Sequence, residues 1–247
     1  MKITLMLLAL IAMLVRAEHA HACSCSAPRI TVSPDGTDAP INATVVVWVP
    51  SYVVKGTDVS LSLRMKTTGD TVAVDFRTVG AASVTVVELM PRVKLAVKTE
   101  YEIVQGAAVV GAFTTGTRQL SAVPVWGGIG KSGFYKDTAV CCICNTSNPY
   151  ARLALAEKLD DRKPYRVAIW MAGSDGKIDY KKPPVTYEQT ADTLWLGHPS
   201  TCSPANFLFP KQQSLKLGVK LVDLAGNAST ASEITLDLTK PERPPDN

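Results

Sequence analysis

The sequence has little that would hold the mature chain in a membrane. Residues 3–15 form an uncharged apolar run of thirteen residues, whereas a transmembrane helix needs about 20. The run follows Lys2 and precedes a polar stretch with small residues at Ala20 and Ala22. This order is typical of a cleaved secretory signal. We therefore expect residues 1–22 to be a signal peptide, and no transmembrane segment in the mature chain.

Histidine is scarce, which restricts the catalytic arrangements that the chain could contain. Two of the three histidines fall in the expected signal, so a Ser-His-Asp or Cys-His site would have to use His198. That residue lies beside Pro199 in a predicted loop, and the sequence has no Gly-x-Ser-x-Gly motif. The adjacent Asp160 and Asp161 are more typical of a turn than of acid–base chemistry. The sequence predicts no enzyme and no cofactor.

An excess of charge is also missing. The net charge is +4, and it falls to +3 when the signal is removed with its two basic residues and one acidic residue. Such a small charge, without a long basic run, argues against a nucleic-acid partner. The 225 residues left from 247 − 22 have room for one large domain or for two of about 100 residues.

Cysteine is absent from the 115 residues between Cys25 and Cys141. An exported protein favours disulfides, so we predict that all six cysteines form them. Three cysteines cluster at residues 141–144. Our hypothesis is that one of them pairs with Cys202, while the other two of the cluster pair with Cys23 and Cys25. The six are Cys23, Cys25, Cys141, Cys142, Cys144 and Cys202.

A metal or redox site is the alternative use of these thiols. Cys141, Cys142, Cys144 and Cys202, with His198, could supply soft ligands. The Cys-Cys-x-Cys spacing is tighter than the pairs typical of zinc sites, so we predict no bound metal.

A lipid anchor is the alternative use of Cys23, the first residue of the expected mature chain. Bacterial lipoprotein signals place a large aliphatic residue three positions before such a cysteine and a small one two before, where this chain has Ala20 and His21. The mismatch disfavours a membrane-anchored lipoprotein.

Alternating apolar and polar residues predict an all-β chain. Residues 59–66 alternate strictly, as a half-buried strand requires. Further strands are expected in the first half at residues 44–49, 71–77, 83–87, 100–103 and 108–113, and in the second half at residues 123–126, 152–157, 165–170, 193–196, 215–222 and 232–238. Turn signals separate them, which indicates antiparallel sandwiches.

The alternation lapses after residue 116, so we place a domain boundary near residue 120. Residues 151–158 could also form a short helix, since alanine, leucine, glutamate and lysine favour one. The turn at Asp160-Asp161 favours instead a hairpin of residues 152–157 with residues 165–170. The proline-rich segment 241–247 is expected to be a disordered tail. We expect core packing for at least three of four tryptophans, rather than a carbohydrate platform: Trp48, Trp126, Trp170 and Trp195.

Two groups of motifs give the chain a family resemblance. In the first half, Pro34-x-Gly36-x-x-x-Pro40-x-Asn42 precedes a valine-rich strand, followed by Leu95-x-x-x-Thr99-x-Tyr101-x-Ile103 and Phe113-Thr114-Thr115-Gly116. The second half contains Asp223-Leu224-Ala225-Gly226-Asn227. These motifs resemble those of bacterial immunoglobulin-like domains in surface and adhesin proteins. The resemblance implies two tandem antiparallel immunoglobulin-like β-sandwiches, at residues 23–119 and 120–240.

Physical chemistry predicts three structural roles within these motifs. Tyr101 is expected to bury its ring and direct its hydroxyl to a backbone carbonyl, as in a tyrosine corner. Gly226 suits a turn that needs a positive φ. Asp223 or Asn227 is expected to accept hydrogen bonds from nearby backbone N–H groups.

The sequence therefore predicts an exported, non-catalytic binding or structural module at the bacterial cell envelope, in the periplasm or at the extracellular cell surface. Its partner is expected to be a protein or glycan at the cell surface that meets exposed loops or an edge strand. A metal-binding or redox-active periplasmic protein is the alternative.

Overall fold

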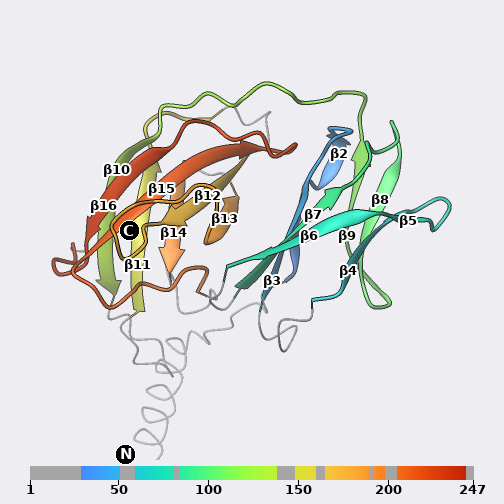
Figure 1. Cartoon of the computed structure of the whole chain (residues 1–247). Coiled ribbons are helices and arrows are strands. Elements are labelled where there is room, and N and C mark those ends of the chain that lie inside the picture. Colours follow the sequence, from blue (N-terminus) through green and yellow to red (C-terminus); the bar gives the residue numbers. More distant parts are fainter. Residues whose placement is uncertain are drawn as a thin grey trace, which may run out of the picture.

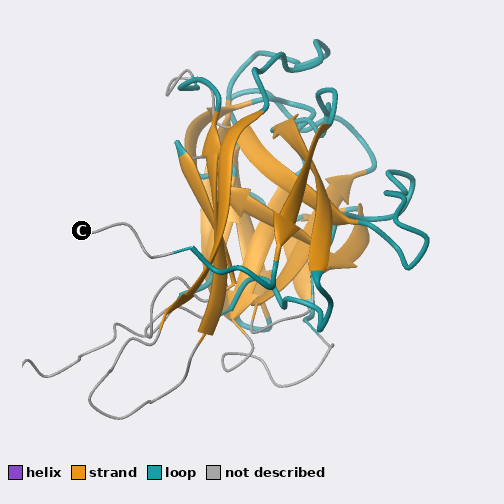
Figure 2. Cartoon of the chain, turned by 90° about the vertical axis from the view of Figure 1, so that its left-hand side faces the viewer, coloured by secondary structure: helices purple, strands orange, loops and turns teal. Residues whose placement is uncertain are grey.

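The computed structural model describes residues 29–50, 59–80, 84–137, 148–159, 165–189, 192–197 and 205–242. Within these ranges the chain is all-β, with strands joined by loops and turns and no helix (Figures 1 and 2). No helix in the described part is long and apolar enough to cross a membrane. The predicted signal peptide, residues 1–22, lies outside these ranges.

The first half forms two sheets. One has the strand order β1-β3-β7-β6 and the other β2-β9-β8-β4-β5. All their pairs are antiparallel except β2 with β9, which is parallel. The strands are β1 (Thr31–Ser33), β2 (Gly36–Ala39), β3 (Val45–Pro50), β4 (Leu61–Met65), β5 (Thr71–Val72), β6 (Val74–Val79), β7 (Val84–Pro91), β8 (Glu100–Gln105) and β9 (Ala108–Thr115).

The second half also forms two sheets, ordered β10-β11-β14 and β13-β12-β15-β16, with antiparallel pairs throughout. No described strand of one half pairs with a strand of the other. The strands are β10 (Ile129–Asp137), β11 (Asn148–Leu155), β12 (Tyr165–Met171), β13 (Thr186–Gln189), β14 (Thr193–Gly197), β15 (Ser214–Asp223) and β16 (Ser232–Asp237).

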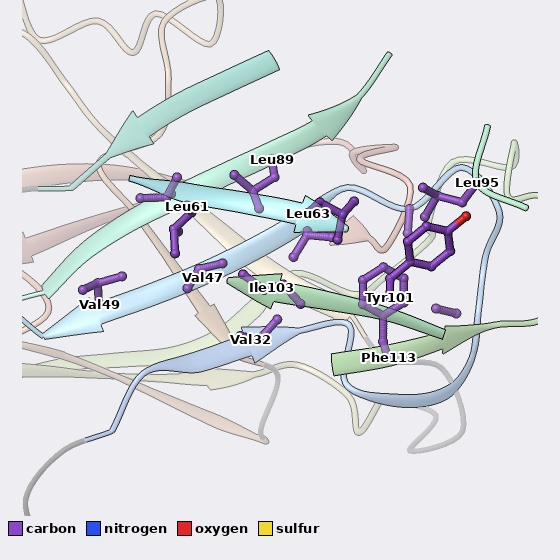
Figure 3. Close-up of a cluster of buried hydrophobic side chains, with 14 residues drawn as sticks. Val32, Val47, Val49, Leu61, Leu63, Leu89, Leu95, Tyr101, Ile103 and Phe113 are labelled. Carbon is purple, nitrogen blue, oxygen red and sulfur yellow. The ribbon is translucent and has the colours of Figure 1, made fainter. Parts of the chain in front are cut away.

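Each half has its own apolar core between its two sheets. In the first half, the alternating residues Leu61 and Leu63 of β4 point inward, as their pattern predicts, and meet Val47 and Leu89 from the facing sheet (Figure 3). In the second half, β15 contributes alternate residues from Leu215 to Leu221 to the corresponding core.

Tyr101 is buried in the first core and stacks on Phe113, with ring centroids 5.6 Å apart. Its hydroxyl accepts a 2.8 Å hydrogen bond from the Ala96 N–H. The expected partner was a carbonyl, but the backbone upstream of β8 presents an N–H instead. The closing contact of a tyrosine corner is therefore present with donor and acceptor exchanged.

The turn after β15 has the predicted geometry. Gly226 has φ +87°, in the left-handed region. Asp223 Oδ1 accepts hydrogen bonds from the backbone N–H groups of Ala225 and Asn227, at 2.8 and 2.9 Å. The carboxylate therefore satisfies two turn donors, as the sequence predicts.

Three local predictions differ from the structure. Residues 71–77 do not form one strand, because the chain crosses between sheets at Ala73 and divides into β5 and β6. Residues 123–126 precede the first strand of the second half, which begins at Ile129. The hairpin of residues 152–157 with 165–170 is wrong, because β11 pairs with β10 and β14 while β12 lies in the other sheet.

The C-terminal segment also differs in part from the predicted tail. The Glu242 N–H donates to the Phe134 carbonyl at 2.7 Å, and the Tyr135 hydroxyl donates to the Glu242 carboxylate at 3.1 Å. The segment thus follows β10 as far as Glu242, and the remaining residues of the tail lie outside the described ranges.

Candidate binding site at the junction of the two halves

Strand β3 is buried on both of its faces. Val45, Val47 and Val49 belong to the first core. Val46 and Trp48, which point the opposite way, pack in a third apolar cluster with residues of the second half. A nearly continuous apolar run is what a strand buried on both faces requires. The valine-rich sequence therefore reflects contact with the second half as well as a local core.

Strand β12 mirrors this arrangement from the other side. Val167 and Ile169 lie in the second core, whereas Ala168 and Trp170 belong to the third cluster. We call this third cluster the junction. Its buried members are Val46, Trp48, Val79, Val86, Ala168, Trp170, Tyr187 and Val222. The sheets β1-β3-β7-β6 and β13-β12-β15-β16 thus face each other between the halves (Figure 1).

Hydrogen bonds to backbone carbonyls also cross the junction. The Trp48 indole N–H donates to the Tyr187 carbonyl at 2.7 Å, and the Thr44 backbone N–H donates to the Leu224 carbonyl at 2.7 Å. The first of these bonds is buried. Directional bonds added to close apolar packing fix one orientation of the halves.

A charged cluster also lies at the junction. Glu88 of β7 is buried and forms an ion pair with Arg77 of β6. Its carboxylate also hydrogen-bonds the Tyr187 side chain from the second half. Burial raises the pKa of Tyr187, and the neighbouring Glu88 carboxylate raises it further. The phenol therefore stays protonated and acts as a donor to Glu88.

Arg166 of β12 completes the charged cluster. It is fully buried, and one of its terminal nitrogens donates to the Asp223 carbonyl at 3.0 Å. Burial lowers the pKa of its guanidinium to about 10, while Tyr187, Glu88 and Asp223 oppose that shift. At neutral pH Arg166 is a buried cation, and Glu88 is a nearby buried acidic group from the other half.

An open groove lies beside the junction and has a volume of about 410 Å³. Both halves line it, with Thr78, Val79 and Gly80 at the end of β6 facing residues of the second half. A methyl group added at Gly80 would lie 3.2 Å from the Val185 carbonyl oxygen, so the halves approach closely here. The second half contributes Met171, Pro183, Pro184, Val185, Asn206, Phe207 and Leu208.

The groove lining is mostly apolar and partly exposed. Met171 and Leu208 are 37% and 64% exposed, so the groove presents apolar side chains to solvent. The lining amide, Asn206, already donates both N–H groups, to the Trp195 carbonyl at 2.8 Å and to Glu188 Oε1 at 2.9 Å. Burial raises the pKa of Glu188 to about 8, although the hydrogen bonds from Asn206 and Thr186 act to lower it. The groove thus offers apolar contact and few free side-chain donors.

The sequence-predicted site residues fall mostly outside the described structure. All six cysteines lie there, with His198, Asp160 and Asp161. In the described ranges, no group of three or more histidine, cysteine or acidic side chains could hold a metal. The predicted disulfides therefore stay a prediction.

The tryptophans are distributed differently from the prediction. Trp48 and Trp170 are buried, but at the junction rather than in the core of either half. Trp126 and Trp195 are half-buried. The indole of Trp126 packs against the second core, and the Arg152 guanidinium lies 5.7 Å from the Trp195 ring centroid.

Sequence reasoning missed Glu88 and Arg166. The sequence does contain a pattern that could have identified them, because each is a charged residue in an otherwise apolar strand. The two runs are Val86-Val87-Glu88-Leu89 and Arg166-Val167-Ala168-Ile169. A charge within a strand buried on both faces requires a partner. Nothing local in the sequence indicates that the partners come from opposite halves.

Comparison with known proteins gives distant structural similarity only. No family model and no curated protein matches the sequence. A pullulanase from Anoxybacillus sp. LM18-11, solved in complex with maltotriose, aligns with 83% of this chain and 25% of its own length, at 6% identity and a TM-score of 0.30. The chain thus spans about a quarter of the pullulanases that it matches.

Two structures of tandem modules align over most of their length. The tandem Ig repeats of Dlar cover 85% of this chain and 99% of their own, at 11% identity and a TM-score of 0.28. The fibronectin(III)-like modules of Clostridium thermocellum CbhA cover 84% and 93%, at 12% identity and a TM-score of 0.20. Superpositions this loose do not assign a fold family or a function to this chain.

Proposed function

We propose that the protein is an exported, non-catalytic binding module of the cell envelope, built from two immunoglobulin-like sandwiches that are held as one rigid unit. The strand orders support the sandwich assignment. In the first half, β1-β3-β7-β6 and β9-β8-β4 correspond to the ABED and GFC sheets of that architecture, with β2 and β5 added at the edges. The Tyr101 contact at the start of β8 supports the same assignment.

Export and disulfide formation belong to this proposal. The signal-like residues 1–22 motivate export. Strand register supports a bond between Cys202 and the cysteine cluster, because Gly197, where β14 ends, pairs with Tyr150, two residues from the start of β11. Cys144 lies four residues before β11 and Cys202 five residues after β14. Extended chain spans at most about 3.6 Å per residue, so these cysteines are within reach of each other.

Intact-mass measurement of protein purified from the exported fraction tests this part of the proposal. We expect the mass of residues 23–247 less six hydrogens, and a gain of six hydrogens on reduction, as three disulfides require. An acylated mass would show a lipid anchor instead. Retained residues 1–22, or free thiols before reduction, would contradict export or the disulfides respectively.

The groove beside the junction is the observation that carries the binding role. Its apolar lining, with exposed Met171 and Leu208 and an Asn206 amide whose N–H groups are both engaged, fits an apolar side chain better than the hydroxyl groups of a glycan. We therefore infer a protein partner that inserts an apolar side chain between the halves. The junction keeps both walls of the groove in a fixed relation, which lowers the ordering cost of binding.

Binding to isolated cell envelopes of the source organism tests this function. We expect the mature chain to co-sediment with envelopes, and protease treatment of the envelopes to abolish the binding. Replacing both Met171 and Leu208 by lysine should weaken it by about tenfold or more, as the loss of an interface anchor does.

A matched control replaces Val97 and Val109 by lysine. These residues are 54% and 49% exposed and are absent from the groove lining, so the change in charge and surface polarity is the same. The control variant should bind like the unmodified chain. Equal losses in both variants, or no binding by the unmodified chain, would refute the proposed site.

A further inference from the structure

Strand β6 has one side that pairs with nothing in the described structure. It lies at the end of its sheet and pairs only with β7 (Figure 1). Phe76, in the middle of the strand, is 55% exposed, which makes it the most exposed aromatic residue among the large apolar side chains of the described chain. An unpaired strand edge with an exposed aromatic residue is a template for another strand.

The register shows which backbone groups of β6 are free. Residue 73 lies opposite residue 92, and the Arg92 N–H donates to the Ala73 carbonyl at 3.0 Å. In an antiparallel pair the hydrogen-bonded positions alternate, so Asp75 and Arg77 direct their backbone groups to β7. Val74 fits the same alternation: it lies opposite Pro91, which has no N–H to donate, so this is not a hydrogen-bonded pair.

The backbone N–H and C=O groups of Phe76 and Thr78 therefore point to the open side of β6. An antiparallel strand that paired there would form its hydrogen bonds with these residues and with Val74. A second strand can therefore adopt only registers that place its own hydrogen-bonding residues opposite Val74, Phe76 and Thr78.

We propose that the partner of this edge is β6 of a second copy of the chain, in a two-fold symmetric antiparallel pair centred on Phe76. In this register Phe76 lies opposite its own copy, and Val74 lies opposite Thr78 of the other protomer. Asp75 of each protomer then lies opposite Arg77 of the other. The sequence Val74-Asp75-Phe76-Arg77-Thr78 is thus self-complementary in charge about its central residue.

The Asp75–Arg77 positions are the non-hydrogen-bonded pairs of this arrangement, in which the facing side chains come closest. Asp75 already pairs with Arg92, and Arg77 with Glu88 and the Tyr187 hydroxyl. Asp75 is nevertheless exposed and Arg77 partly exposed, so both side chains remain accessible to a second strand. A two-residue shift in either direction would place Asp75 opposite Asp75 or Arg77 opposite Arg77, and like charges directly opposite destabilise a pair. Charge therefore selects this single register, and it favours a second copy over an unrelated strand.

Sedimentation equilibrium of the mature chain, from micromolar to near-millimolar protein, tests the proposal. We expect a reversible monomer–dimer equilibrium that persists under reducing conditions. Replacing Phe76 by lysine should weaken the dimer by about tenfold or more, because two like charges then meet on the two-fold axis. The matched variant Val97→Lys alters a side chain of similar exposure elsewhere in the first half and should leave the dimer unchanged.

A second variant separates edge pairing from side-chain contact. Thr78→Pro removes an N–H that points to the open side of β6 and leaves the bonds to β7 intact, so the fold should tolerate it. We expect this variant to be folded and monomeric. In the unmodified chain, hydrogen exchange at the Phe76 and Thr78 amides should slow as protein concentration rises. A monomer at all concentrations, a dimer lost on reduction, or a dimer unaffected by both variants would overturn the proposal.

Discussion

Replacing Glu88 by glutamine is expected to lower the free energy of unfolding by about 3–5 kcal/mol, the usual cost of leaving a buried charge without its partner. Glu88 is the buried carboxylate of the charged cluster, and it interacts with Arg77 from its own half and with Tyr187 from the other. Glutamine has nearly the same shape, so the loss measures charge rather than volume. In this variant no carboxylate of the first half offsets the cost of burying the Arg166 guanidinium.

Urea denaturation of the unmodified and variant chains measures this loss. Glu100→Gln is the matched control, since Glu100 forms a 2.8 Å ion pair with Lys66 but both side chains are largely exposed. Exposed pairs contribute about 0–1 kcal/mol, so the control should remain close to the unmodified chain. Similar losses for both variants would show that the Glu88 carboxylate is not held in a buried cluster.

The double variant Glu88→Gln with Arg166→Met distinguishes electrostatic coupling from independent effects. Once residue 166 is apolar, the second half no longer buries a cation. The double variant should therefore lose less free energy of unfolding than the sum of the losses of the two single variants. Strict additivity would indicate that Glu88 and Arg166 are not coupled across the junction.

Local pattern predicts the half-buried strands of this protein well. In β4, the alternation of Leu61 and Leu63 with polar residues fixes both the strand and its inner face. In β10, the stretch Gly130-Lys131-Ser132-Gly133 has no apolar alternation, and the strand depends on pairing with β11. β1 and β2 are three and four residues long and pair with strands far away in the sequence. Tertiary pairing therefore determines the strands that the pattern missed.

The junction could not be predicted from the same pattern. A run such as residues 45–49 indicates burial on both faces, but the sequence does not say what covers the second face. Trp48 and Trp170 look like core residues because aromatic side chains in apolar strands usually are. Their location between the halves follows from how two sheets pack face to face, which depends on the whole surface of each sheet.

Replacing Trp48 by alanine is expected to cost about 3–5 kcal/mol of the free energy of unfolding, as truncation of a buried large side chain does. The substitution empties the centre of the junction and leaves the Tyr187 carbonyl without its indole donor. Trp126→Ala is the matched control. Its indole also donates to a backbone carbonyl, of Thr230 at 3.1 Å, but the side chain is only half-buried and is not part of the junction. Trp126→Ala should lower the free energy of unfolding by less than half as much as Trp48→Ala does.

The shape of the unfolding transition separates a junction effect from a loss within one core. Because the junction joins two cores that are otherwise distinct, the unmodified chain should unfold in a single cooperative transition. Trp48→Ala weakens the coupling while leaving both cores intact, so its transition should broaden or divide into two, with a lower denaturant dependence for each. Trp126→Ala should keep one transition at a lower midpoint. If Trp48→Ala also kept one sharp transition, the two halves would be coupled mainly through the charged cluster, and the Glu88 variant should then be the one that divides it.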